Sequence, residues 1–263
     1  MSKKDLHGNV VEMPVEAPAQ ETHSPLSQFE IKNIVDLHIG SFDISLTNSA
    51  LYMIFATLFS ILFLHFATKK RQIIPSKIQL IAEGFYSFID NMVISSIGEE
   101  GKKFMPFVFS LFIFILLCNI LGMTPYAFTA TSQVAVTLAL ALLSILTVII
   151  FAIYRNGIAG FFHMFLPSGV PLWMAPFIFL IEFFSFLIRP LTLSVRLFAN
   201  MVAGHVLLKV VAGFIISLGV LIGIFPFLFS VLMTGFELFV AVLQAYIFAI
   251  LVCAYLGETT RSH

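Results

Sequence analysis

Ionisable side chains interrupt two long apolar segments near the C-terminal end of the chain, and their types suit the transfer of protons. Arg196 lies in the run LTLSVRLFAN, and Glu237 lies in the run TGFELFVAVL. A charged side chain at the centre of a bilayer costs at least about 2.5–3.5 kcal/mol on insertion scales, so such residues usually mark ion pathways or partner contacts. His205 and Glu237 both titrate and can therefore accept and release protons. Together these residues predict a proton pathway within the membrane.

The spacing of the polar residues in the first segment follows a helix. Glu182, Arg189 and Arg196 are seven residues apart, which places them on one helix face. Asn200 lies one turn beyond Arg196 on that face, whereas His205 follows Arg196 by nine residues and points to roughly the opposite side. We therefore expect this helix to present two distinct polar faces.

The second segment repeats the spacing of seven with Glu237 and Gln244. If the two segments form antiparallel helices, Arg196 and Asn200 can lie opposite Gln244, while His205 pairs with Glu237 nearer the far end. The proton-translocating residues predicted from this arrangement are Arg196, Asn200, His205, Glu237 and Gln244.

Structural explanations compete with these roles. Arg196 could be a cation held by Glu182 or Glu237, and Arg189 precedes a proline and could extend its head group to the membrane surface. Glu182 could mark the rim of its helix in the same way. Gln244 could join two helices by a hydrogen bond. His205 could be a packed histidine without a role in transfer.

The composition requires a lipid environment for most of the chain. Hydrophobic residues make up 59% of the 263 residues, charged residues 11%, and the mean hydropathy is +1.02. Soluble domains carry about 25% charged residues. The zero net charge gives no indication of a nucleic-acid partner. Two isolated cysteines, Cys118 and Cys253, indicate neither a disulfide framework nor a metal site, and we expect no cofactor.

Apolar runs of about 20 residues predict the membrane crossings. Residues 78–97 are amphipathic, carry Glu83 and Asp90, and predict a helix lying at the membrane interface. Residues 1–46 are expected to form a polar tail, since they lack the apolar run of a secretory signal, and residues 47–263 are expected to form the membrane domain. The basic stretch from Lys69 to Lys77 places the tail on the non-cytoplasmic side. The predicted fold is an all-α membrane protein with five transmembrane helices, at residues 48–67, 104–123, 134–154, 173–210 and 215–256.

The last two crossings are too long to stand upright in a bilayer. Two helices of about 35–40 residues are each more than about 50 Å long, whereas the hydrocarbon core is about 30 Å thick. We expect them to form a long, tilted hairpin whose turn lies near Lys209–Gly219.

The segment LTLSVRLFANMVAGH, residues 191–205, closely resembles the signature of subunit a of F-type ATP synthases. The segment from Glu237 to Phe248 resembles the last helix of the same family. Further similar segments are PLSQFEI from Pro25, TNSAL from Thr47, NILGMTP from Asn119 and VTLALAL from Val136. Some members carry the acid and the histidine in exchanged order, and some carry an acid where this chain has Gly122.

The resemblance implies a mechanism. Subunit a packs against a rotating ring of c-subunits, each with a membrane carboxylate, and offers two offset half-channels to that carboxylate. The essential arginine that separates the half-channels corresponds to Arg196. His205, Glu237, Gln244 and Asn200 match positions along the outer half-channel or around the arginine. Supporting positions are Glu182, Arg189 and Asn119.

The expected function is that of a non-catalytic, proton-translocating stator subunit in the Fo sector of a rotary ATP synthase. The sequence has no Gly-rich phosphate loop, so nucleotide chemistry would reside in partners. Expected partners are the c-ring, the b-type peripheral stalk and the F1 sector, in a bacterial plasma membrane rather than a mitochondrial inner membrane. The alternative is a secondary ion-coupled transporter, for which broken helices in corresponding halves would be expected.

Overall fold

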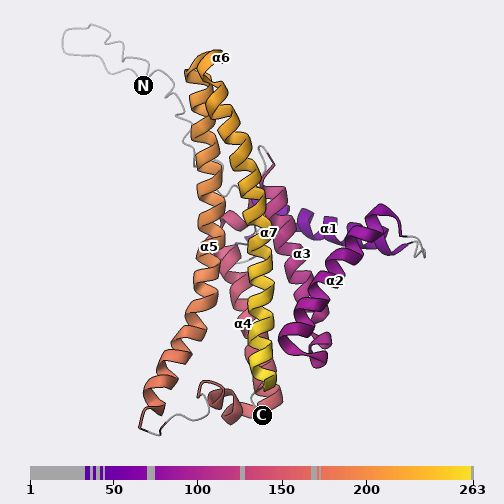
Figure 1. Ribbon diagram of the computed structural model, residues 1–263, viewed down its shortest axis with the longest axis vertical. Coiled ribbons are helices and arrows are strands. Elements are labelled where there is room, and N and C mark those ends of the chain that lie inside the picture. Colours follow the sequence, from indigo (N-terminus) through magenta and orange to yellow (C-terminus); the bar gives the residue numbers. More distant parts are fainter. Residues whose placement is uncertain are drawn as a thin grey trace, which may run out of the picture.

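The computed structural model describes residues 33–35, 38–39, 42–43, 45–69, 75–124, 128–166, 171 and 173–261 (Figure 1). The N-terminal motif from Pro25, the basic residues Lys70 and Arg71, and most of the predicted tail lie outside these residues. The described part is helical apart from short turns and four short strands. The helices are α1 (Asn48–Lys69), α2 (Lys77–Ile97), α3 (Met105–Gly122), α4 (Val134–His163), α5 (Ala175–Ser217), α6 (Gly219–Ile222) and α7 (Ile224–Arg261), with 3-10 turns η2 (Glu99–Lys103) and η3 (Ala130–Ser132).

Five of these helices are long and apolar enough to cross a membrane, namely α1, α3, α4, α5 and α7. This confirms the prediction of an all-α integral membrane protein. The amphipathic α2 is not among them. It begins at Ser76, whose hydroxyl accepts a hydrogen bond from the backbone N–H of Gln79 at 3.3 Å, as an N-cap does. Its end at Gly98 has a φ of 93°, a backbone conformation suited to glycine.

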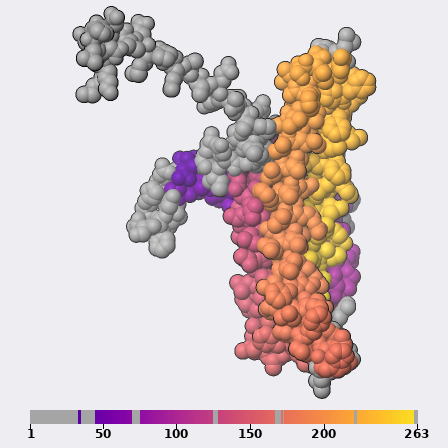
Figure 2. Space-filling view, turned by 90° about the vertical axis from the view of Figure 1, so that its left-hand side faces the viewer, coloured from indigo at the N-terminus to yellow at the C-terminus, as the bar shows by residue number. Residues whose placement is uncertain are grey.

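The longest elements are α5 and α7, which both run along the long axis of the molecule, lie side by side near α6 and diverge toward the other end (Figures 1 and 2). With 43 and 38 residues they are about 65 and 57 Å long. Figure 1 shows that α1 runs across their direction rather than along it. Helix α1 has 22 residues, about the length of one crossing. If α1 crosses the bilayer along its normal, the hairpin must be strongly tilted from that normal.

The turn of the hairpin comes later than its sequence predicts. Lys209 and Gly213 lie inside α5, and the chain reverses only through α6, between Leu218 and Gly223. The predicted range Lys209–Gly219 therefore contains the start of the turn, but it begins too early and stops before the turn is complete. A helix tolerates one lysine or glycine, whereas the break requires Gly219, whose φ is 72°.

Gly219→Ala is expected to destabilise the hairpin by about 1–2 kcal/mol, because an L-residue is strained in the left-handed region even though nothing lies within 4 Å of the added Cβ. Gly213→Ala is the matched control. It also meets nothing within 4 Å, but it lies in regular helix and should stabilise α5. Thermal unfolding in detergent measures both. An equal effect of the two substitutions would contradict the assignment of the turn to Gly219.

Helix α4 continues past its predicted end at residue 154 as far as His163. A backbone break at Gly157, with φ 70° and ψ 176°, separates its last six residues from the membrane-crossing part. Just before this break, Arg155 pairs with Glu100 of η2. The hydrogen bond and the charge of Arg155 hold the pKa of Glu100 below its usual range. The segment between the crossings predicted at residues 134–154 and 173–210 therefore begins as helix.

The core lies around the C-terminal half of α7. That half packs against α2, α3, α4 and α5, and its alanines at 241, 245 and 249 are fully buried. The N-terminal half of α7 instead exposes large apolar side chains such as Phe236 and Phe239. Most of α1 is exposed as well, which suits contact with lipid. The tip of the hairpin thus projects beyond the bundle that holds its other end (Figure 1).

Short strands occur within the segment predicted as a tail. β1 (Asn33–Val35) pairs antiparallel with β4 (Leu46–Thr47), and β2 (His38–Ile39) pairs antiparallel with β3 (Phe42–Asp43). Val35 and Ile39 are β-branched residues of the kind that favours strands. These strands lead directly into α1.

Candidate functional site

Pro190, inside α5, interrupts the hydrogen bonding of the helix close to the polar residues. Pro190 has no N–H and therefore leaves the carbonyl of Phe186, four residues earlier, without its helical partner. The hydroxyl of Tyr255 on α7 lies 3.5 Å from that carbonyl and donates a long hydrogen bond to it. The Arg189 guanidinium lies over the Tyr255 ring, 5.7 Å from its centroid. These contacts join α5 to the end of α7.

A small polar cavity lies at the same place. Its volume is about 30 Å³, enough for a water molecule. Glu182, Arg189, Tyr255 and Glu258 line it, together with apolar side chains from α5 and from the two residues that follow α4. Two carboxylates and one guanidinium therefore meet at this end of the hairpin, and we call these four residues the lower cluster.

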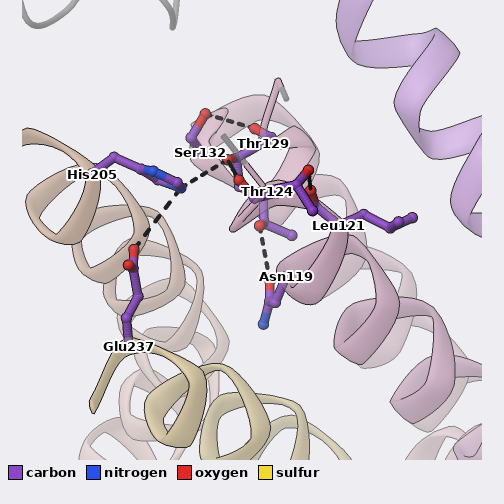
Figure 3. A network of polar contacts seen from close by, with 9 residues as sticks. Asn119, Leu121, Thr124, Thr129, Ser132, His205 and Glu237 are labelled. Atoms are coloured by element: carbon purple, nitrogen blue, oxygen red, sulfur yellow. Dashed lines mark hydrogen bonds and ion pairs between the residues drawn. The ribbon is translucent and has the colours of Figure 1, made fainter. Parts of the chain in front are cut away.

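A second polar group lies farther along the hairpin, where α5 and α7 bring His205 and Glu237 together (Figure 3). Nε2 of His205 is 3.9 Å from Oε1 of Glu237, and the two side chains are 12% and 5% exposed. Gly204 allows this approach, because a Cβ at that position would collide with the Glu237 carboxylate. The structure thus brings together the histidine and carboxylate that the sequence paired.

Gly204→Ala is expected to push the Glu237 carboxylate away from His205 and to slow proton conduction about tenfold, the scale of one lost polar contact. Gly235→Ala is the matched control on α7, since nothing lies within 4 Å of its added Cβ. Proton uptake by vesicles containing the assembled complex measures both. Equal rates for Gly204→Ala and wild type would show that the close approach at Gly204 has no functional consequence.

The connection between α3 and α4 covers the histidine. Oγ1 of Thr129 lies 3.1 Å from Nε2 of His205 and donates a hydrogen bond to the carbonyl of Gly122 at 3.0 Å. The hydroxyl of Ser132 donates to the carbonyl of Thr129 at 2.6 Å. The turn η3 also packs against α5, so the connection is fixed from both sides.

Asn119 holds this connection against α7. Its side chain is fully buried, donates through Nδ2 to the carbonyl of Ala241 at 3.2 Å, and accepts a hydrogen bond from Thr131 Oγ1 at 2.8 Å. Through these two hydrogen bonds, the side chain of Asn119 on α3 is linked to both η3 and α7. We call His205, Glu237, Thr129, Asn119 and Thr131 the upper cluster.

Arg196 lies between the two clusters along α5 and is exposed. Within the described part of the chain it forms no hydrogen bond and no ion pair. Ala199 and Ala203, which follow it by three and seven residues, are exposed as well. An arginine and two small side chains therefore form a face of α5 that this chain leaves uncovered.

The predicted opposition of Arg196 and Asn200 to Gln244 does not appear as a hydrogen bond. Gln244 is 1% exposed, so it faces the interior while Arg196 faces outward. Among the described residues, neither Nε2 of Gln244 nor Nδ2 of Asn200 has a hydrogen-bond partner, although both atoms are buried. Buried amide N–H groups of this kind can donate hydrogen bonds to a water molecule.

Several residues of the two clusters were not predicted. Thr129 and Thr131 belong to the short stretch TATSQ between two apolar runs. The hydroxyl residues of this stretch were the only feature of the sequence that could have indicated a role in the site. Tyr255 and Glu258 lie near the chain end, where polarity is ordinarily explained by the membrane surface. Thr129 contacts His205, and Tyr255 contacts Phe186, across more than 60 residues of sequence, so only the fold shows these two contacts.

Comparison with protein families identifies the family of the chain. A family model described as ATP synthase A chain matches residues 50–257, which is most of the chain. The match includes Arg196, His205, Glu237 and Asn119, and it ends just before Glu258.

Proposed function

The chain belongs to the ATP synthase A chain family, and on that premise we propose that it is the stator subunit whose two half-channels carry protons to and from a rotating ring of carboxylates. A subunit of this family is a proton-translocating component of the membrane sector. The observation that carries the finer proposal is the position of Arg196, which lies between two separate polar clusters on one helix.

The distances along α5 support two half-channels rather than one pore. His205 lies nine residues after Arg196, and Glu182 lies fourteen residues before it. At the rise of an α-helix these intervals correspond to about 13 and 21 Å. The upper cluster would serve one side of the membrane and the lower cluster the other, so that a proton must leave the chain near Arg196 to pass between them.

Arg196 would act on a carboxylate that this chain does not supply. A guanidinium remains charged at all relevant pH values, and its positive charge favours the ionised form of a nearby carboxylate. The exposed Ala199 and Ala203 leave room for a closely packed partner helix. Each passing ring carboxylate would therefore release its proton near Arg196, and the same charge would repel protons that could otherwise cross directly.

The upper cluster would supply protons to the ring. His205 and Glu237 both titrate and lie close enough to exchange a proton after a small movement. Asn119 fixes the neighbouring connection, while the buried amides of Asn200 and Gln244 offer polar positions toward the arginine. Glu182 and Arg189 would belong to the opposite half-channel. The chain itself would carry out no catalytic chemistry.

The partners follow from the same proposal. They are the c-subunit ring at the face of Arg196, the b-type peripheral stalk that keeps the stator from turning, and the F1 sector that makes ATP. The membrane in this proposal would be a bacterial plasma membrane rather than a mitochondrial inner membrane.

Co-purification in mild detergent tests this assignment. We expect the chain to be isolated with a small apolar protein that carries a membrane carboxylate and is present in ring stoichiometry. Isolation of the chain alone, with thermal stability that rises on addition of a small substrate, would instead indicate a secondary transporter.

A further inference from the structure

We propose that Thr129 is a positioning residue that holds His205 with its proton on Nε2, so that the histidine can only donate at the edge facing Glu237. This inference rests on the proposed function, because it assigns a direction to one contact of the upper cluster. It adds a residue and a protonation state that the family resemblance does not specify.

The hydrogen bonds of Thr129 determine the direction. A threonine hydroxyl has one proton to donate, and a carbonyl oxygen can only accept. Since Thr129 Oγ1 lies 3.0 Å from the carbonyl of Gly122, its proton is committed to that bond. The 3.1 Å contact with His205 Nε2 must then run the other way, with Nε2–H donating to Oγ1. In the neutral ring the lone pair is consequently on Nδ1.

The hydroxyl has little freedom to leave this position. Thr129 is 2% exposed, and the Ser132 hydroxyl holds its carbonyl at 2.6 Å. A Cβ at Gly122 would collide with the Thr129 side chain, so the chain is closely packed on that side as well. If the hydroxyl turned toward Nε2, it would leave the Gly122 carbonyl without this partner, which costs free energy in an apolar surrounding.

A proton on Nε2 of His205 sets the direction in which the histidine can pass a proton to Glu237. Oε1 of Glu237 is buried and forms no hydrogen bond within the described residues, and it lies 3.9 Å from the same Nε2. A movement of less than about 1 Å would bring the two atoms within hydrogen-bond distance. Nε2 then meets Glu237 as a hydrogen-bond donor. Once Nδ1 has taken up a proton, the imidazolium can pass its Nε2 proton to the Glu237 carboxylate, and the ring that remains is neutral with its proton on Nδ1. The charged groups facing His205 are Glu237 from α7 and Lys209 from α5. The η3 connection offers hydroxyl groups at this place.

The protonation state can be measured directly. In the assembled complex, with only this chain labelled with ¹⁵N-histidine, the ring nitrogens of protonated and unprotonated type have distinct chemical shifts. The chain has seven histidines, and comparison with His205→Gln identifies the signal of His205. We expect the neutral ring to carry its proton on Nε2 in the wild type and in Thr129→Ser. A proton on Nδ1 in the wild type would overturn the proposal.

Thr129→Val tests whether the hydroxyl affects proton uptake, because valine has nearly the same shape as threonine but no hydroxyl. We expect the preference for Nε2–H to be lost and proton uptake by vesicles to fall about tenfold, whereas Thr129→Ser restores both. In a His205→Gln background, Thr129→Val should have no further effect. A similar loss in that background would mean a merely structural role and would contradict the proposal.

The outcomes also separate this inference from the proposed function. If His205→Gln conducts protons at the wild-type rate, the relay is wrong, whereas the tautomer still reports on Thr129. If Thr129→Val does not assemble, the spectra of the wild type and Thr129→Ser decide the question. A wild-type tautomer that is unchanged in assembled Thr129→Val would refute the role of the hydroxyl.

Discussion

Replacement of Arg196 by alanine is expected to abolish proton-driven ATP synthesis while the chain remains inserted and assembled. The side chain is exposed and makes no hydrogen bond or ion pair among the described residues, so its loss removes no contact that holds this chain together. It removes the fixed positive charge that would favour release of the proton from the ring carboxylate. Synthesis in membrane vesicles, normalised to the amount of complex, measures the effect.

Two further variants sharpen this result. Arg155→Ala also removes an arginine, but one that pairs with Glu100 outside the proposed path, and it should retain coupled synthesis. Arg196→Lys keeps the charge without the planar guanidinium and should retain a small residual activity at most. Normal coupled synthesis in assembled Arg196→Ala would refute the proposed role of the arginine.

Substitution of Glu237 or His205 by alanine is expected to slow proton uptake about 10²-fold without abolishing assembly. This is the scale on which a positioned acid or base assists proton transfer. Because the two side chains lie 3.9 Å apart and would act in one step, the double variant should lose little more than either single variant. Potential-driven acidification of vesicles stripped of their catalytic sector provides the rate.

The controls test whether the acid at position 237, rather than any carboxylate of the chain, is required. Glu237→Asp keeps the acid and should recover part of the rate, whereas Glu237→Gln should not. Glu99→Ala removes an exposed carboxylate of η2 and should leave the rate unchanged. If His205→Ala and Glu237→Ala both conduct at the wild-type rate, the relay assignment is wrong.

The sequence predicts the membrane-crossing helices well because each depends on a local property, a run of apolar residues of sufficient length. The all-α architecture and the five crossing helices are confirmed by the structure. The predicted range for the turn of the hairpin contains Gly219 but begins too early, because Lys209 and Gly213 are accommodated within α5. What ends α5 is the backbone conformation at Gly219, and residue type alone does not reveal it.

The site also contains contacts that the sequence could predict and contacts that depend on the fold. Spacing along single helices was enough to pair His205 with Glu237, which the structure brings to 3.9 Å. It was not enough to find Thr129, because its contact with His205 depends on how the connection between α3 and α4 folds over α5. Nor could it show that Gln244 faces inward while Arg196 faces outward, since that depends on which helices cover α7.

Disulfide cross-linking tests most directly the central claim, that the face of Arg196 lies against a ring carboxylate. The two native cysteines are buried and can be replaced by alanine. A cysteine at exposed position Ala199 is paired with one placed beside the carboxylate of the small ring protein, and Leu58→Cys on α1 is the exposed control. A cross-link is expected from Ala199→Cys alone, and it should stop ATP synthesis until reductant is added. A cross-link from Leu58→Cys but not from Ala199→Cys, or a cross-linked Ala199→Cys complex that still makes ATP, would contradict the claim that Arg196 faces the ring.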